Sequence, residues 1–224
     1  MAFPFSKGDN ILQNIVFDFD GTLADSGDTG ILATQTAFSS FQLRVPKAEV
    51  IDYFMGIPIE VSFKKMVPDH VFSEQEFQEL LISFRSYYKR FEDEHLVLFP
   101  DVGSTLKSLY AQKKQLFVVS SKHSTALLRN LSHLGINHYF KGIVSSDQVS
   151  HFKPHPEGLL NLIDKFALDV GNTIMIGDAT FDLKMGSAAG IKTGGVVWGA
   201  HDIELLRHEN PDYIFRSPIE WLTI

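Results

Sequence analysis

Two aspartates, Asp18 and Asp20, come directly after the apolar residues 15–17 and stand two positions apart. Residues i and i+2 of a strand share a face, so both carboxylates can point into one small volume. Two uncompensated carboxylates that close repel each other and force one pKa upward. Such a pair needs a cation, a shared proton, or a division of labour between a nucleophile and an acid/base. An ordinary strand that ends in a polar turn through Gly21 and Thr22 is the alternative that these residues alone leave open.

A second pair of acids follows the apolar residues 174–177. Asp178 stands where that predicted strand ends, and Asp182 lies four positions later on the same face of the helix that begins there. Parallel sheets bind ligands at the carboxyl ends of their strands, so we expect Asp178 to meet Asp18 and Asp20 at one edge. Helix capping explains one acid, but not acids at two separate strand ends. Clustered carboxylate oxygens favour Mg²⁺, which usually works beside a phosphate.

Two further segments could hold that phosphate. Ser120 and Ser121 lie where another predicted strand ends, and a hydroxyl with free backbone amides at a strand-to-helix turn suits a phosphate oxygen. Lys153 precedes Pro154 and Pro156, whose restricted backbones would hold its ammonium on a stiff segment. A serine before a helix is usually a cap, and a lysine is usually solvated. Neither segment is therefore specific without the acids.

The elements that must position these residues alternate between apolar β-like runs and helical segments, which is typical of a parallel α/β sheet. Several of the runs are apolar throughout, as expected for strands covered on both faces. The predicted strands are 14–19, 115–120, 142–145, 173–177, 193–197 and 212–214. The predicted helices between them are 102–113, 124–134, 156–166, 179–189 and 202–208.

The interval from residue 26 to residue 98 interrupts this alternation with helical patterns and no convincing strand. It contains a predicted capping box that begins at Ser73, followed by an apolar stripe at helical spacing. So long a helical block is far beyond a normal crossover and indicates an inserted subdomain. We therefore predict a Rossmann-like α/β core from residues 1–25 and 97–224, with an all-helical cap at residues 26–96. The stripe, read as the core of the cap, is Phe77, Leu80, Leu81, Phe84, Tyr87, Tyr88 and Phe91.

Composition narrows the classes of protein. A net charge of −7 and the lack of a Lys/Arg cluster argue against nucleic-acid binding. No apolar stretch is long enough to span a bilayer, and no secretory signal is recognisable, which favours a cytoplasmic protein without a membrane partner. Zero cysteines exclude a thiolate metal site and a thiol nucleophile. His151 and His155 are interpreted as non-ligands because Pro154 interrupts any helix between them.

Four segments, in this order, resemble the haloacid-dehalogenase-like hydrolase superfamily. Residues 18–22 resemble its first motif and 118–121 its second, Lys153-Pro154 resembles the third, and Gly177-Asp178 with Asp182 the fourth. The helical block after the first motif is similar to the small cap of that superfamily, so the match spans nearly the whole chain. Within that superfamily, the chain is most similar to the phosphoglycolate phosphatase-type group, on the basis of residues 55–58, 99–102 and 153–156.

The resemblance implies a Mg²⁺-dependent phosphatase that hydrolyses a phosphoglycolate-like phosphate monoester of a small metabolite. It implies Asp18 as the nucleophile that forms an aspartyl-phosphate, and Asp20 as the general acid/base. Mg²⁺ would be held by the Asp18 carboxylate, the Asp20 backbone carbonyl and Asp178. Asp182 would support the site without binding the ion directly. The cap would close over the site and exclude water.

The same resemblance makes Lys153 a catalytic residue that binds the transferring phosphoryl together with Ser120 and Ser121. Relatives often have Asn where this chain has Ser121. The change is mild because the phosphate needs the backbone N–H at that position.

Other activities stay open at this point. Asp20 argues against dehalogenases and transport ATPases, but not against phosphomutases of the β-phosphoglucomutase type. Those enzymes carry a basic residue just after the Gly turn of the cap, where this chain has residues 57–60 without one. Inorganic pyrophosphatase is a further alternative. Lys64 and Lys65 are candidates for substrate selection by charge alone, and the protein is expected to be a monomer or a homodimer.

Overall fold

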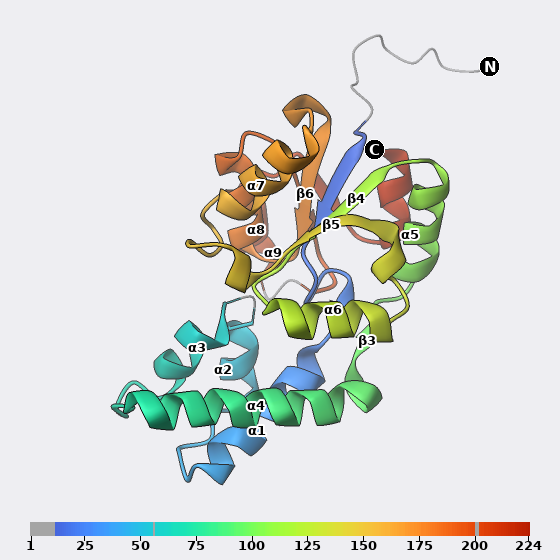
Figure 1. Ribbon diagram of the computed structural model, residues 1–224. Helices are drawn as coiled ribbons and strands as arrows, with labels where there is room; N and C mark the ends of the chain where they lie inside the picture. The colour runs from blue at the N-terminus through green and yellow to red at the C-terminus, as the bar shows by residue number, and fades with distance from the viewer. Residues whose placement is uncertain (1–11, 56, 200–201) are drawn as a thin grey trace, which may run out of the picture.

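The computed structural model describes residues 12–55, 57–199 and 202–224. Within them, six strands form one parallel sheet in the order β5-β4-β1-β6-β7-β8 (Figure 1). β1 therefore lies between β4 and β6, so the three predicted chemistry-bearing strand ends are neighbours. The strands are β1 Asn14–Phe17, β4 Gln115–Val119, β5 Phe140–Val144, β6 Thr173–Gly177, β7 Lys192–Val196 and β8 Tyr213–Phe215.

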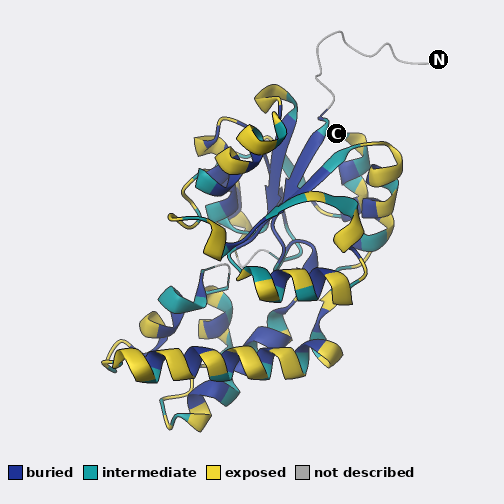
Figure 2. Ribbon diagram, viewed as in Figure 1, coloured by how far each residue is buried: buried dark blue, intermediate teal, exposed yellow. Residues whose placement is uncertain are grey.

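Helices cover both faces of this sheet, which explains the uninterrupted apolar runs. In β1, Ile15 and Phe17 belong to one buried cluster and Val16 to the other. The first cluster includes residues of α5, α6 and the C-terminal 3₁₀ helix η4, and the second includes residues of α7 and α8. The central strands β1, β4 and β6 are accordingly almost wholly buried, whereas the edge strands β5 and β8 are partly exposed (Figure 2). The covering elements are α5 Val102–Ala111, α6 Ser124–His133, α7 Glu157–Phe166, α8 Thr180–Ala188, α9 Ile203–His208 and η4 Pro218–Thr223, with shorter 3₁₀ turns η1 Asn137–Tyr139, η2 Ser146–Gln148 and η3 Val170–Asn172.

The four described helices between β1 and residue 96 form a second layer below the sheet in Figure 1, with a buried cluster of their own. The predicted apolar stripe packs into this cluster from α4. Ser73 caps α4, since its Oγ accepts a hydrogen bond from the Glu76 N–H at 3.1 Å. The carboxylate of Glu76 contacts His70 at 2.9 Å instead of returning to Ser73, so half of the predicted capping box forms. These helices are α1 Gly27–Ser40, α2 Ala48–Tyr53, α3 Ile59–Met66 and α4 Glu74–His95.

The expectation that residues 26–98 hold no strand is wrong at one end. β3 (Val97–Leu98) pairs antiparallel with β2 (Ala24–Asp25), so the chain enters and leaves the helical insert side by side. A strand of two residues has no periodicity, and its sequence therefore carried no signal. The predicted fold class, a parallel sheet with an all-helical insert, is confirmed. The boundaries of core (1–25, 97–224) and cap (26–96) stay a prediction.

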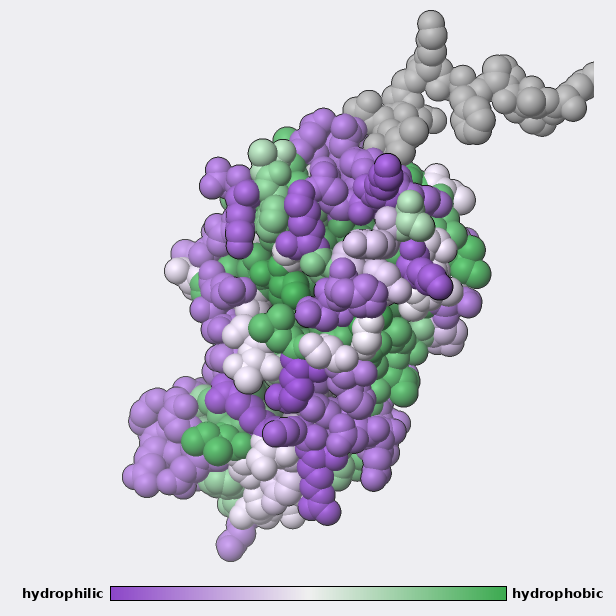
Figure 3. Space-filling view, turned by 45° about the vertical axis from the view of Figure 1, so that its right-hand side comes forward, coloured by the Kyte–Doolittle hydropathy of each residue, from purple (hydrophilic) through white to green (hydrophobic). Residues whose placement is uncertain are grey.

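No helix in the described part of the chain is both long and apolar enough to cross a membrane. In the view of Figure 3, the surface of the four-helix layer is mostly hydrophilic, with a small hydrophobic patch. The apolar residues of these helices are therefore largely directed inward, where they form the buried cluster.

Candidate active site

Three carboxylates meet at the carboxyl ends of β1 and β6. Oxygens of Asp18, Asp178 and Asp182 lie within 4.8 Å of one another. The pairing of β1 with β6 brings them together, because Phe17 stands opposite Ile176 and the Asp18 N–H donates to the Ile176 carbonyl at 2.9 Å. The predicted meeting of acids from two strand ends therefore forms.

The backbone turn after β1 lies close to the carboxylate of Asp178. Gly21 has φ +80°, and a Cβ added there would lie 2.3 Å from Asp178 Oδ2. Glycine is thus required both by the left-handed backbone and by the close approach. The next residue, Thr22, donates its hydroxyl to Asp178 Oδ1 at 2.8 Å and fixes that carboxylate. The candidate turn residues of the first motif therefore shape the acidic cluster.

Lys153 is buried between two of the acids. Its ammonium lies 2.5 Å from Asp18 Oδ1 and 2.7 Å from Asp182 Oδ1, and its side chain is 7% exposed. The other oxygen of Asp182 accepts the Ala179 N–H at 3.1 Å, which ties this carboxylate to the start of α8. Lys153 is therefore not a solvated surface lysine. A buried ammonium needs charged partners, and it has two.

Burial strongly disfavours the charged forms of these carboxyls. Burial raises the pKa of Asp18 to about 7. The positive charge of Lys153 acts to lower this pKa, and the negative charge of Asp182 acts to raise it further. Burial also raises the pKa of Asp178 well above its ordinary range, again reinforced by Asp18 and Asp182. The pKa of Lys153 is raised as well, because the attraction of Asp18 and Asp182 outweighs the cost of burial. One ammonium therefore leaves the cluster short of positive charge.

Asp20 is directed to a different set of partners. Its Oδ1 accepts a hydrogen bond from Ser26 Oγ at 2.6 Å and lies 3.0 Å from the Lys122 ammonium. Lys122 also donates to the hydroxyl of Tyr88 on α4 at 2.8 Å. Burial lowers the pKa of Lys122, but Asp20 and Tyr88 more than offset this, and the net shift is upward. The carboxylate of Asp20 thus stands beside the three-acid cluster and not in it.

Sequence reasoning missed Ser26 and Lys122. Lys122 directly follows the two serines of the predicted phosphate turn, and that position was the available signal. Ser26 lies six residues after Asp20, beyond any helical or strand spacing, so only the fold reveals the contact.

The two serines that end β4 lie at the same edge. Ser120 is 5% exposed, and its Oγ accepts the Lys122 N–H at 3.1 Å. The Oγ of Ser121 is buried, and among the described residues it has no hydrogen-bond partner. Both serines line one cavity together with Asp18 and Asp20. An unpartnered hydroxyl in such a cavity is suited to a ligand oxygen.

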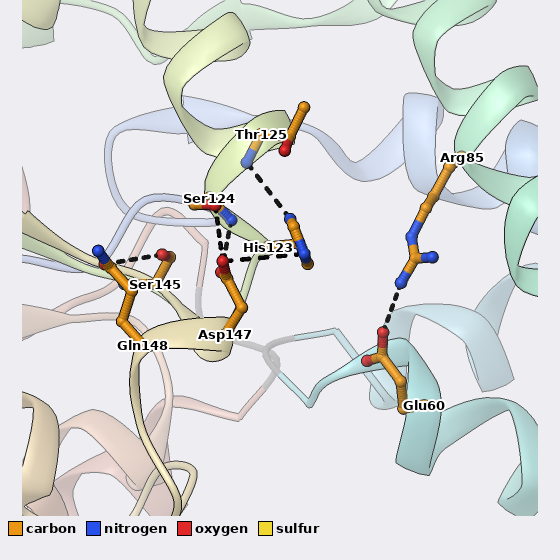
Figure 4. Close-up of polar contacts among 8 residues, drawn as sticks. All are labelled: Glu60, Arg85, His123, Ser124, Thr125, Ser145, Asp147 and Gln148. Carbon is orange, nitrogen blue, oxygen red and sulfur yellow. Dashed lines mark hydrogen bonds and ion pairs between the residues drawn. The ribbon is translucent and has the colours of Figure 1, made fainter.

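A polar network steadies the turn that follows these serines (Figure 4). Asp147 accepts both the N–H and the Oγ of Ser124, each at 2.7 Å. These bonds lower the pKa of Asp147 to about 2, against the opposing effect of its partial burial. The bonds from Ser124 to Asp147 thus fix the start of α6 near the phosphate turn. Beside this network, Arg85 of α4 and Glu60 of α3 pair at 2.7 Å (Figure 4).

Other sequence candidates lie elsewhere. Lys64 and Lys65 are exposed and line none of the cavities next to the acids, and the Lys64 ammonium instead covers the ring of Phe77 at 4.4 Å. His151 and His155 do come together, with ring centroids 4.4 Å apart, although no helix joins them. Their interpretation as non-ligands stays a prediction.

Comparisons with known proteins agree with this geometry. A sequence model described as haloacid dehalogenase-like hydrolase matches residues 15–196. Pyrophosphatase PpaX of Oceanobacillus iheyensis is 30% identical over 213 residues, which cover 95% of this chain and 96% of the relative. A crystal structure described as a predicted phosphoglycolate phosphatase from Haemophilus somnus has a TM-score of 0.89 at 26% identity, and the match covers 96% of this chain and 99% of that one. A haloacid dehalogenase-like hydrolase from Streptococcus pneumoniae has a TM-score of 0.81 at 30% identity, over 95% and 97% of the two chains. The chain therefore belongs to the haloacid dehalogenase-like hydrolase family.

Proposed function

We propose that this protein is a phosphatase that hydrolyses a phosphate monoester of a small metabolite in a Mg²⁺-dependent reaction, with Asp18 as the nucleophile. The observation that carries the proposal is the position of Asp18. It is buried at the end of the central strand, is paired with Lys153, and lines a cavity together with Ser121, whose hydroxyl has no partner among the described residues. Attack of its carboxylate on phosphorus would form an aspartyl-phosphate and split one difficult step into two.

The acids of the site fit a magnesium ion. Three carboxylates face a single ammonium, and burial raises the pKa of two of them. Hard oxygen ligands of this kind suit Mg²⁺. Asp18, Asp178 and the backbone carbonyl of Asp20 would hold the ion, while Asp182 would support it through Lys153. The ion would neutralise both the crowded acids and the phosphoryl oxygens.

Asp20 is the proposed general acid/base. In the first step it would protonate the leaving oxygen of the ester, and in the second it would take a proton from the attacking water. Ser26 and Lys122 hold its Oδ1, which limits the orientations of the carboxylate. These two side chains are positioning residues in this proposal.

Ser120, Ser121 and Lys153 would bind the transferring phosphoryl group. Catalysis of phosphoryl transfer depends largely on such positioning and on electrostatic stabilisation. The buried Oγ of Ser121 supports this role, because a phosphoryl oxygen would supply the partner it lacks. Residues 26–96 would act as the cap, since their helices supply most of the other walls of the same cavity.

A second candidate is hydrolysis of inorganic pyrophosphate, favoured by the 30% identity to a relative named pyrophosphatase. It would use the same nucleophile, with phosphate as the leaving group. The two candidates differ in what the cap must recognise, and not in the chemistry at Asp18.

The test is release of phosphate from a generic phosphate monoester, with Mg²⁺ and with a chelator. We expect activity that requires Mg²⁺ and falls at least about a thousandfold in Asp18→Asn. Asp28→Asn is the matched control, because it also removes one carboxylate but from the exposed first turn of α1. Activity that survives Asp18→Asn or complete removal of divalent metal would refute the proposal.

A further inference from the structure

The cavity that contains the phosphate turn extends into the helical insert. Its volume is about 340 Å³, within the size range of small-molecule sites. The core contributes polar groups at one end, including Asp18, Asp20 and the two serines. The insert contributes an apolar wall from three of its helices and the α2–α3 connection. This wall is formed by Ile51, Phe54, Met55, Phe63, Met66 and Phe84.

The basic side chains of this lining already have acidic partners. Lys122 lies 3.0 Å from Asp20, and Arg85 lies 2.7 Å from Glu60. Arg129 makes two hydrogen bonds to the Glu92 carboxylate, at 2.5 and 2.8 Å. Among the described lining residues, no lysine or arginine is therefore left without an acidic partner to receive a second anionic group of a substrate.

A second cavity, of about 550 Å³, shares Asp20, Ser26 and Met55 with the first. It is lined by carboxylates, which repel an anion. A second anionic group of a substrate would therefore be disfavoured in this cavity as well, whereas the apolar wall of the first cavity suits an uncharged group. The acids of the second cavity are Asp20, Asp25, Glu49, Asp52 and Asp178.

We propose, on the basis of the function proposed above, that the substrate is a phosphate monoester whose alcohol part is apolar and uncharged, of the size of an aromatic ring or a branched alkyl group. The apolar wall gains free energy by removing such a group from water. A carboxylate or a second phosphate would instead lose its hydration without gaining an unpaired cation. This class differs from the phosphoglycolate-like substrate that the family resemblance implies.

Two esters whose leaving alcohols share the benzyl skeleton separate these classes. Benzyl phosphate and 4-carboxybenzyl phosphate differ in one remote charge, so their intrinsic reactivities are nearly equal. With Mg²⁺ present, we expect kcat/KM for benzyl phosphate to be about tenfold or more above that for the carboxylated ester. Phosphoglycolate and pyrophosphate, measured beside them, should be poorer substrates than benzyl phosphate.

A positive charge placed in the apolar wall gives an independent test of the substrate class. Phe54→Lys adds a cation at a partly buried position of the first cavity's lining, and should narrow the preference about tenfold or reverse it. Val71→Lys adds the same charge at a residue that is 91% exposed, and should leave the preference unchanged. Should Phe54→Lys fail to fold, the comparison of esters with the unmodified protein still decides the question.

The outcomes separate this inference from the proposed function. Equal or faster turnover of the carboxylated ester, phosphoglycolate or pyrophosphate would overturn the substrate class while leaving the phosphatase chemistry intact. No Mg²⁺-dependent hydrolysis of any ester or of pyrophosphate would overturn the proposed function, and this inference with it.

Discussion

The ammonium of Lys122 donates a hydrogen bond to the hydroxyl of Tyr88 at 2.8 Å and so connects the end of β4 to helix α4. Tyr88 is 6% exposed and the Lys122 side chain 12%, so water cannot readily replace the bond. Lys122 is also the ion-pair partner of Asp20, so the contact connects Asp20 to the helical insert. It is a structural link between the proposed acid/base and the proposed cap.

Tyr88→Phe should therefore destabilise the protein by about 1–2 kcal/mol, because a buried, charge-assisted hydrogen bond is lost and Lys122 keeps one fewer partner. Urea denaturation measures the change. Tyr87→Phe is the matched control one residue earlier, because the Tyr87 hydroxyl has no hydrogen bond to any described residue. It should change the free energy of unfolding by less than about 0.5 kcal/mol. Equal effects of the two substitutions would contradict the role given to this bond.

Gly21→Ala should impair the metal site as well as stability. The added Cβ would lie 2.3 Å from Asp178 Oδ2, on a backbone with φ +80°, so the turn and the carboxylate must separate. Gly190→Ala is the control, because Gly190 has φ +73° with no atom within 4 Å of the added Cβ. That control should cost only the left-handed penalty of about 1–2 kcal/mol. Calorimetric titration with Mg²⁺ should show weaker binding in Gly21→Ala alone, and unchanged affinity would refute the steric argument.

Lys153→Met should cost about 3–5 kcal/mol of stability in the absence of divalent metal, because it leaves buried acids without their ammonium. Lys165→Met removes an exposed lysine in the last turn of α7 and should be close to neutral. Chemical denaturation in chelator compares the two. If Lys153→Met were no more destabilising than Lys165→Met, the buried charge balance described for the acids would be wrong.

The raised pKa values of the acids predict how metal binding depends on pH. The pKa of Asp18 is raised from 3.8 to about 7 in the folded protein, so the metal-free protein loses stability as the pH rises through that value and the buried carboxyl must ionise. Mg²⁺ binds the ionised form and releases the proton. The increase in melting temperature caused by Mg²⁺ should therefore grow from about pH 6 to about pH 8. A Mg²⁺ effect that shrinks over this range would contradict the assignment.

The sequence allowed prediction of those features that depend on local pattern. The central strands were recognisable because both of their faces are buried, and the acids were expected together because parallel strands end at one edge. Tertiary contacts were not accessible in this way. The approach of Ser26 to Asp20, and that of Lys122 to Tyr88, depend on how the insert folds back onto the sheet. The β2–β3 pair was missed because strands of two residues have no period.

The predicted capping box shows the same limit on a smaller scale. Ser73 caps α4 as its local spacing predicts, but the carboxylate of Glu76 finds His70 as a partner instead. The stripe on α4 marked a buried face correctly, yet did not indicate that part of this face also lines a cavity. Pattern identifies what is buried, while the three-dimensional arrangement decides what the buried residues surround.

The central claim is that Asp18 carries the phosphoryl group during turnover. The most direct measurement is acid quenching of the protein during Mg²⁺-dependent turnover of a phosphate monoester, followed by proteolysis and mass spectrometry of the peptide that contains Asp18. The account predicts one phosphoryl group on Asp18, absent in Asp18→Asn and absent without substrate. A phosphoryl group on another residue, or full turnover with no phosphorylated peptide in any quench, would contradict it.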